Sequence, residues 1–388
     1  MLLKGFGFSG YRSFGDNLVK IAPLKKINMI IGQNNVGKSN IINFLSSQYS
    51  LFMSKAKGER TYGQEQKPTF SDIDHPISDI KTSHRISFPI FKDEVDDYIG
   101  KKLSGKGAQF AHKEHLNSGY LKKLLTSACF SDEDGNVWFT YKADNPNGSF
   151  LLDISIDAVI SILDRTEWQS LWQSLSGASG GDLKEHWVPD TIRLVSFVPD
   201  SVPKIEIIPA IRKIGSAGSE AADFSGEGII ERLAKIQNPS LTDLSLKDKF
   251  ISINKFVQNV LQNPSAQIEI PYQRDMIQVH MDGKSLPLES LGTGVHEVII
   301  IAAASTLLDE TILCVEEPEL HLHPLLQRKL IKYLSDETTN QYFFTTHSAH
   351  LLDAVEAEIF HVTLVNGVSK VEAISSTKQR SNICNDLG

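Results

Sequence analysis

The stretch that decides the fold is KINMIIGQNNVGKSNIINF, residues Lys26–Phe44. Its apolar run Ile27–Ile31 predicts a buried strand, and a helix is expected to begin at Lys38–Ser39. The turn between them fits the pattern G-x-x-x-x-G-K-[ST] at Gly32, Gly37, Lys38 and Ser39. Because backbone N–H groups of such a turn and of the helix N-terminus converge, they can bind phosphate oxygens.

Each residue type in this turn has a chemical reason. Glycine takes the backbone angles that a tight turn needs. Lys38 can place a mobile positive charge between the outer phosphates, and the Ser39 hydroxyl can bind Mg²⁺. A chance match is the alternative, but the strand before and the helix after are the context that the motif requires. The predicted phosphate site comprises Gly32, Asn34, Asn35, Val36, Gly37, Lys38, Ser39 and Asn40.

A second group of signals begins at Ser290. SLGTG (Ser290–Gly294) is a glycine-marked turn before an apolar helix expected over Val295–Leu308. A helix N-terminus that follows small residues is suited to bind an anion. The apolar run Thr311–Val315 comes next and ends in the acidic segment EEPE, residues 316–319. Carboxylates beside a buried strand are costly unless they meet a cation or transfer a proton, so this segment points to chemistry.

A third strand is expected over Gln341–Thr345, after a helix at Leu325–Ser335, and it ends in THS, residues 346–348. The carboxyl ends of parallel strands lie at one edge of a sheet, where ligands bind. We therefore expect the glycine-bounded turn, the acidic segment and THS, each of which follows one of these strands, to form a single site.

Roles for the polar residues follow from phosphoryl-transfer chemistry, in which positioning and charge stabilisation dominate. Glu316 would hold Mg²⁺ through water, and Glu317 would orient or deprotonate the attacking water. His347 would contact the γ-phosphate or that water; a helix-cap or core histidine would be the favoured reading of an isolated THS. His321 and His323 invite a metal site, but two histidines in one turn are expected to make structural or subunit contacts.

The composition is that of an ordinary globular protein: 388 residues, 41% hydrophobic and 22% charged. A net charge of −8 is unlike that of a dedicated nucleic-acid binder, so any contact with DNA must be local. The three cysteines are widely spaced, offer no zinc spacing and suit a reducing compartment. The first residues lack a signal-peptide pattern and no apolar run reaches membrane-spanning length, so we expect a cytoplasmic protein.

Shorter patterns predict the remaining elements. Strands are expected at residues 2–8, 11–14, 18–21, 86–91, 137–141, 150–156, 192–198 and 205–208. Helices are expected at 38–47, 157–175, from 229 and at 250–261, with a hairpin at 268–281 and a loop at 54–84. Trp168 and Trp172 are expected to pack in a core. The lysine-rich run Lys101–Lys123 could face DNA or be a solvated helix face.

The four motifs together resemble a known family. Gly32–Ser39, SLGTG, ILCVEEPELHLHP (312–324) and FFTTHS (343–348), in this order, are similar to an ABC-type ATPase head of the AAA_21/OLD kind; OLD stands for overcoming lysogenization defect. The resemblance covers about residues 1–48 and 285–365. It implies an α/β fold, an ABC-type P-loop ATPase head with a mixed sheet, helices and a divergent α/β insertion. It also implies ATP and Mg²⁺ as cofactors.

In that family two heads dimerise head to tail. The signature turn of one head completes the nucleotide site of the other, which implies nucleotide contacts for Ser290, Gly292, Thr293 and Gly294. GYRSFGD (10–16) resembles the entry of these ATPases, where an aromatic residue or an arginine lies beside the adenine. Candidates for that role are Tyr11, Arg12 and Phe14, with edge-strand packing as the alternative.

The sequence departs from the family pattern at three points. Glu316 stands where many relatives have Asp, although the longer side chain still reaches a hydrated Mg²⁺. A Gly-Thr pair replaces the Ser-Gly of transporter-type signatures, so a hydroxyl contact to the γ-phosphate carries over only to Ser290 or Thr293. The Mg²⁺-sensing glutamine is unassigned, with Gln64 and Gln66 available.

We expect one ATPase head over residues 1–375, with an insertion at about 54–286, and a linker or the start of a further domain at 376–388. Full-length OLD proteins continue into a Toprim nuclease domain, whose acidic motif does not occur within these residues. The first hypothesis is a homodimeric ATP-hydrolysing head that controls an attached or separate nuclease or other effector in bacterial anti-phage defence. The alternatives are a repair-type ATPase clamp that binds DNA directly and a non-hydrolysing nucleotide sensor.

Overall fold

The computed structural model describes residues 2–58, 74, 83–104, 114–143, 150–201, 203–215, 218, 224–348, 351, 355–374 and 380. The chain divides into two compact units. Unit 1 contains Met1–Lys4, Pro23–Ser47 and Val202–Gly388, and unit 2 contains Gly5–Ala22 and Gln48–Ser201. Residues 202–286, expected within the insertion, therefore belong to the same unit as the glycine-bounded turn.

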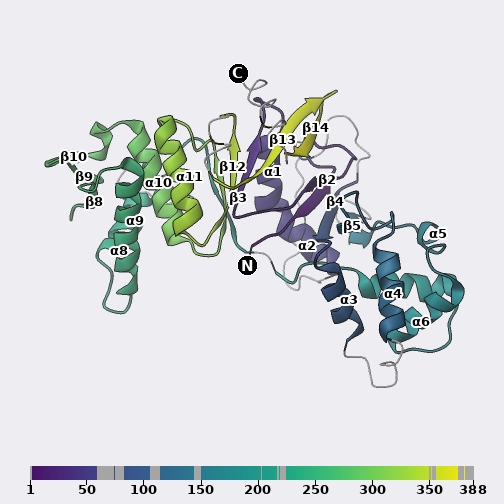
Figure 1. Ribbon diagram of the computed structural model, residues 1–388. Coiled ribbons are helices and arrows are strands. Elements are labelled where there is room, and N and C mark those ends of the chain that lie inside the picture. The colour runs from purple at the N-terminus through teal and green to yellow at the C-terminus, as the bar shows by residue number, and fades with distance from the viewer. Residues whose placement is uncertain are drawn as a thin grey trace. The chain divides into compact units, whose positions relative to one another are not determined.

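Unit 1 is built on a six-stranded mixed sheet with the order β14-β13-β3-β12-β11-β7. Figure 1 labels four of these strands, β14, β13, β3 and β12. Its strands are β3 (Ile27–Ile31), β7 (Ile205–Ile208), β11 (Ile312–Glu316), β12 (Gln341–Thr346), β13 (Glu358–Val365) and β14 (Val368–Ala373). All neighbours are parallel except β14, which runs antiparallel to β13. Because β12 lies between β3 and β11, the carboxyl ends of these three strands meet at one edge. The predicted α/β class with a mixed sheet is confirmed.

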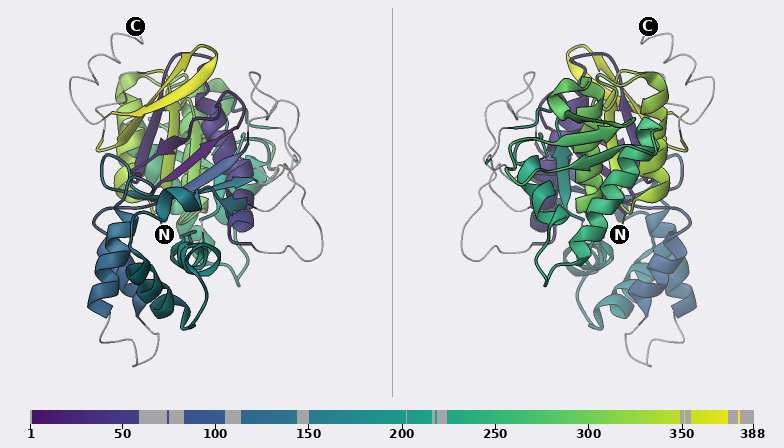
Figure 2. Two further views of the ribbon diagram at one scale, coloured as in Figure 1. Left: turned by 90° about the vertical axis from the view of Figure 1, so that its right-hand side faces the viewer. Right: turned by 90° about the vertical axis from the view of Figure 1, so that its left-hand side faces the viewer.

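Helices cover this sheet on both faces. β3 is buried at all five residues, as expected of a strand in a sheet that is covered on both sides. One face packs against α8 (Ile229–Gln237), α9 (Ser245–Leu261), α10 (Thr293–Leu307) and α11 (Pro324–Glu337). Figure 2 (right) shows these green helices in front of the sheet, whereas α1 (Lys38–Asn43) lies on the opposite face in Figure 1. Residues 297–305 of α10 are all buried, and apart from Glu297 and Ser305 they are apolar, as expected of a helix that is covered on every side.

A small antiparallel meander completes unit 1. It consists of β8 (Gln267–Glu269), β9 (Gln278–Met281) and β10 (Lys284–Pro287), followed by a 3₁₀ turn at Leu288–Ser290. The predicted hairpin at 268–281 is therefore confirmed, and a third strand joins it.

Unit 2 is built on a five-stranded antiparallel sheet with the order β2-β1-β4-β5-β6. Its strands are β1 (Phe6–Ser9), β2 (Val19–Ile21), β4 (Arg85–Ile90), β5 (Val137–Ala143) and β6 (Phe150–Leu152). Its helices are α2 (Ser50–Ala56), α3 (Val95–Leu103), α4 (Glu114–Leu125), α5 (Ile156–Val159), α6 (Arg165–Ser176) and α7 (Val188–Val195), with a π-helical turn at Leu183–Trp187. A further π-helical segment, Phe44–Tyr49, joins α1 of unit 1 to α2. The helix that begins at Lys38 thus continues as far as Ala56, beyond the predicted end at Ser47.

Two predicted elements of unit 2 differ from the structure, one in type and one in extent. The expected strand at 192–198 is largely helix α7, whose buried residues Val188, Ile192 and Val195 recur with helical spacing. The expected helix at 157–175 is two helices, because Asp164 forms a capping box with Glu167 and starts α6 anew. Trp168 and Trp172 of α6 are buried, as predicted.

The expected strand at 11–14 is also wrong. Tyr11 and Phe14 exchange backbone hydrogen bonds across a tight turn, with N–H to O distances of 3.1 and 2.9 Å. Arg12 within this turn has φ +51°, which a strand cannot contain. Among the described helices, none is long and apolar enough to cross a membrane.

Candidate functional site

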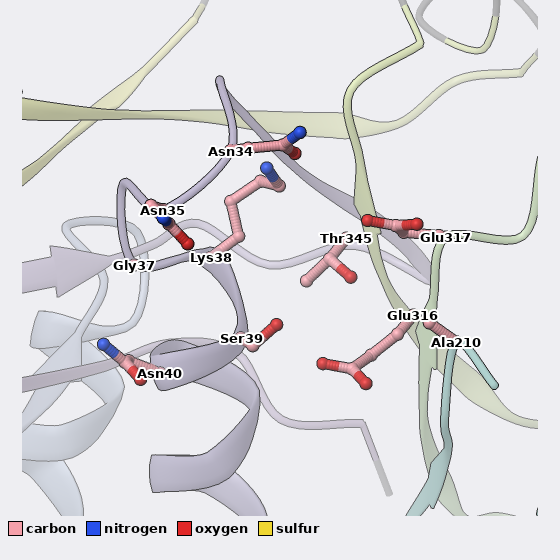
Figure 3. A pocket seen from close by; sticks show the side chains of 10 residues that line it. All are labelled: Asn34, Asn35, Gly37, Lys38, Ser39, Asn40, Ala210, Glu316, Glu317 and Thr345. Atoms are coloured by element: carbon pink, nitrogen blue, oxygen red, sulfur yellow. The ribbon is translucent and has the colours of Figure 1, made fainter. Parts of the chain in front are cut away.

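A cavity of about 370 Å³ lies in unit 1 at the carboxyl ends of β3, β11 and β12. This volume falls within the usual range of small-molecule sites. Its lining residues come from segments far apart in the sequence (Figure 3): Asn34, Asn35, Gly37, Lys38, Ser39, Asn40, Ala210, Glu316, Glu317 and Thr345. The predicted convergence of the glycine-bounded turn, the acidic segment and the end of the third strand is therefore what the fold produces.

The two glycines of the turn are required for different reasons. Gly37 has φ +104°, in the left-handed region, and precedes the first residue of α1. At Gly32 the reason is space, because a Cβ there would lie 2.3 Å from the carbonyl oxygen of Val362 on β13. Val36 is buried and lies outside the cavity lining, and its carbonyl accepts a 2.5 Å hydrogen bond from Ser369 on β14. Strands β13 and β14 thus support the turn from behind.

Lys38 is buried at the floor of this turn. Its ammonium donates to the carbonyl oxygens of Gly32 at 2.8 Å and Gln33 at 2.7 Å. Burial lowers the pKa of Lys38, while the nearby charges of Glu317 and Glu319 act to raise it. A buried ammonium that faces a cavity is arranged to gain from an incoming anion.

The acidic segment supplies two carboxylates to the cavity. Glu316 is the last residue of β11, and Glu317 follows with φ +46°, an uncommon angle for a residue with a side chain. The N–H of Glu317 donates to the carbonyl of Thr345 at 2.8 Å. Figure 3 shows the Glu316 carboxylate and the Ser39 hydroxyl facing one another across the cavity. Hydroxyl and carboxylate oxygens are the hard donors that Mg²⁺ takes, so these residues fit that ion.

His347 lies next to the acidic segment, although it does not line the cavity. Its Nδ1 is 3.6 Å from Oε1 of Glu317. The buried Glu319 holds this region, since its Oε1 accepts from the Thr346 hydroxyl at 2.6 Å and from the His347 N–H at 3.1 Å. Glu319 therefore fixes the end of β12 against the acidic turn, a connection that the sequence alone did not reveal.

Arg212 is the other functional candidate that the sequence patterns missed. It follows β7, and its guanidinium forms an ion pair with Glu297 of α10 and donates to the carbonyls of Glu316 at 3.0 Å and Glu317 at 3.1 Å. A single arginine in a segment without periodicity carries no signal of such contacts. The only hint in the sequence is the short apolar strand β7 before it. That β7 lies beside β11, and so brings Arg212 to the acidic segment, is known only from the sheet order of the structure.

The signature-turn residues begin α10 away from this cavity. Ser290, Gly292 and Thr293 are exposed, and none of them is among the cavity-lining residues. Gly294 lies against the acidic turn, where a Cβ would come within 2.8 Å of the His321 carbonyl. In a single chain, Ser290, Gly292 and Thr293 of the signature turn are therefore exposed to solvent.

Arg12 belongs to unit 2, where its Nε donates to Asp74 at 2.9 Å. Tyr11 and Phe14 are fully buried, and Phe14 packs edge-on against Phe8, so packing is the observed role of these two rings. Gln64 and Gln66 lie outside the described residues.

The remaining histidine and lysine candidates make structural contacts. His323 caps α11 by accepting from the Leu325 N–H at 3.4 Å. In unit 2, Lys122 pairs with Asp96 and Lys123 with Glu167, which favours a solvated helix face over a DNA-facing patch at these two lysines. Residues 105–113 of the lysine-rich run lie outside the described residues.

Comparison with known proteins gives one family match. Residues 213–352 match the family AAA_15, described as AAA ATPase domain. This segment is similar to AAA ATPase domains. It contains the signature turn, the acidic segment and THS, but begins after the glycine-bounded turn. No curated protein matches the chain at a significant level.

Similar solved structures include an SMC head bound to the C-winged helix domain of ScpA, with 14% identity and a TM-score of 0.48 over 98% of this chain and 100% of that one. The SMC head domain from Thermotoga maritima has 14% identity and a TM-score of 0.44 over 97% and 100%. An SMC head with an extended coiled coil, bound to the C-terminal domain of ScpA derived from Pyrococcus furiosus, has 14% and 0.44 over 99% of both chains.

Proposed function

We propose that the chain is an ATP-binding and ATP-hydrolysing head of the ABC type, related to the OLD family. The observation that carries the proposal is the convergence of Lys38 and Ser39 after β3, Glu316 and Glu317 at the end of β11, and Thr345 of β12 on one cavity. A buried positive charge, oxygen ligands for a cation and a carboxylate on a held backbone are the groups that phosphoryl transfer needs.

Each residue of the cavity would have its own role in ATP binding or hydrolysis. Lys38 would exchange its two loop carbonyls for the outer phosphates, and Ser39 and Glu316 would hold Mg²⁺, Glu316 through water. When bound, Mg²⁺–ATP supplies a phosphoanhydride activated for attack by water. Glu317 would orient that water and accept its proton, and His347 would hold the Glu317 carboxylate or contact the γ-phosphate.

We further propose that two copies share the nucleotide. Support comes from the exposure of Ser290, Gly292 and Thr293, which places anion-binding helix-start residues on the surface and outside their own cavity. The turn of one copy would then complete the cavity of the other. The resemblance to the OLD family extends the proposal to an attached or separate nuclease or effector in anti-phage defence, which the ATP state would control.

The experiment that tests ATP hydrolysis compares two substitutions with matched controls. Lys38→Ala should weaken ATP binding about 10- to 100-fold, because it removes a charge-assisted contact worth about 1.5–3 kcal/mol. Binding is measured by titration with a fluorescent ATP analogue. Lys370→Ala, at an exposed lysine of β14, is the control and should bind as the wild type does. Unchanged binding by Lys38→Ala would contradict the phosphate site.

Glu317→Gln should keep ATP binding and lower kcat about 10²- to 10⁴-fold, the usual contribution of a general base. Phosphate release is the measurement, and Glu372→Gln, at an exposed residue of β14, is the control. Equal and negligible turnover in wild type and Glu317→Gln, with intact binding, would instead favour a nucleotide sensor that does not hydrolyse ATP.

A further inference from the structure

A buried arginine joins the acidic segment (residues 316–319) to α10, the helix that follows the signature turn and is called the signature helix below. Arg212 lies on the segment after β7, its side chain has no exposed surface, and that of Glu297 is 5% exposed. The guanidinium uses three nitrogens at once: Nε pairs with Glu297, Nη1 donates to the Glu316 carbonyl and Nη2 donates to the Glu317 carbonyl. The planar fork of arginine can make these bonds simultaneously, whereas an ammonium is a single point charge.

The contact reaches the backbone that aims the Glu317 carboxylate. Glu317 has φ +46°, so its conformation must be maintained by its surroundings. Both of its peptide groups are held: its N–H donates to the Thr345 carbonyl at 2.8 Å, and its own carbonyl accepts from Arg212 at 3.1 Å and from the Leu320 N–H at 3.2 Å. Without Arg212 the carbonyl would keep the Leu320 N–H but lose its buried side-chain donor, and the left-handed conformation would lose one of three hydrogen-bond restraints.

The other end of the contact lies on α10, close to the exposed turn. Glu297 is three residues after Gly294 and so lies one helical turn beyond it on the same side of α10. Gly294 itself approaches the carbonyl of His321, two residues after the acidic segment, so the start of α10 touches that part of the chain directly and is joined to the acidic segment through Arg212.

We propose that Arg212 is a positioning residue for hydrolysis: it holds the Glu317 backbone in the orientation that aims its carboxylate, and it ties that orientation through Glu297 to the signature helix. The proposal rests on the proposed function, because it assigns Glu317 the role given above. It makes the position of α10, whose turn would contact a second copy's nucleotide, an input to the chain's own hydrolytic site.

A purely structural ion pair is the competing explanation, and the kinetic pattern separates the two. Loss of one partner of a buried pair leaves an unpaired charge and can unfold the protein, so single removals are uninformative. The double variant Arg212→Met/Glu297→Met removes both charges and keeps two long unbranched side chains. Arg212→Lys keeps the positive charge but not the three-way fork. Arg193→Met, at an exposed arginine paired with Asp190, is the matched control.

The measurements are melting temperature, affinity for a fluorescent ATP analogue and kcat for phosphate release. The expected result is that the double variant and Arg212→Lys fold and bind ATP within about threefold of wild type, while kcat falls about 10- to 100-fold, as with residues that orient catalytic groups. Arg193→Met should match wild type in all three.

Three outcomes would overturn the proposal: wild-type kcat in the folded double variant, a loss of affinity parallel to the loss of kcat, or failure of both Arg212 variants to fold. None of them touches the proposed function, which Lys38→Ala and Glu317→Gln test independently. Absence of turnover in the wild type would remove the proposed function and this inference together, and that result is recognised before any Arg212 variant is made.

Discussion

Gly32 lets strand β13 pass close to the glycine-bounded turn of the candidate site. Its counterpart Gly37 needs a left-handed backbone, but Gly32 is required because β13 passes so close that no side chain fits. The first glycine of the motif therefore couples the glycine-bounded turn to a strand that lies more than 300 residues later in the sequence.

Gly32→Ala should destabilise unit 1, because its Cβ would lie 2.3 Å from the Val362 carbonyl and force β3 and β13 apart. The expected loss is about 1–3 kcal/mol of unfolding free energy, as for overpacked cores, with weaker ATP binding. Urea denaturation and nucleotide titration measure the two effects. Gly292→Ala is the control for the stability measurement, since nothing lies within 4 Å of its added Cβ. Equal denaturation midpoints for the two variants would contradict the close-approach argument.

At the scale of the element, the end of β12 is anchored by a single buried carboxylate. Glu319 accepts from both the Thr346 hydroxyl and the His347 N–H, so it joins the end of the strand and the candidate catalytic histidine to the acidic segment. Its other oxygen, Oε2, is buried and has no hydrogen-bond partner among the described residues. A carboxylate held so sparsely depends strongly on each donor it has.

Thr346→Val should therefore cost about 1.5–3 kcal/mol of unfolding free energy, the value of a hydrogen bond to a charged group. It keeps the shape of the side chain, so packing is unchanged. Thermal and urea denaturation give the measurement, and Thr363→Val on the half-exposed face of β13 serves as the control, with a change within about 0.5 kcal/mol. A loss no larger than that of the control would show that Thr346 does not anchor Glu319.

At the scale of the whole molecule, the proposed shared site predicts a change of mass with nucleotide. ATP should convert Glu317→Gln, which binds without hydrolysis, from a smaller to a larger species in light scattering. Gly292→Asp should prevent the change, because it places a negative charge in an exposed turn that would meet phosphates. Its melting temperature should stay near wild type, since the added side chain meets open space.

Gly294→Asp is a poorer choice for this test, because its Cβ would collide with the His321 carbonyl in the same chain. Loss of dimers in that variant could reflect local misfolding. If Gly292→Asp responds to ATP as the parent does, or if no species changes mass with ATP, the signature turn does not complete a partner's site.

The sequence by itself determined the local elements of the site. Strand β3 begins and ends as predicted, and α10, β11 and β12 agree to within two residues, because strand and helix periods, glycine turns and apolar runs are local signals. The meeting of the three motifs also followed from sequence, since the carboxyl ends of parallel strands share one edge.

Only the tertiary structure decided the rest. The helix at Val188–Val195, the strands β13 and β14 behind the turn and the contacts of Arg212 were not predicted. Each of these features depends on which distant segment lies beside it, and the neighbouring residues in the sequence do not indicate that segment. Burial and hydrogen bonding at these positions depend on contacts between distant segments, whereas helix and strand propensities depend on the residues within one segment. The contacts that anchor the site could therefore be seen only in the folded structure.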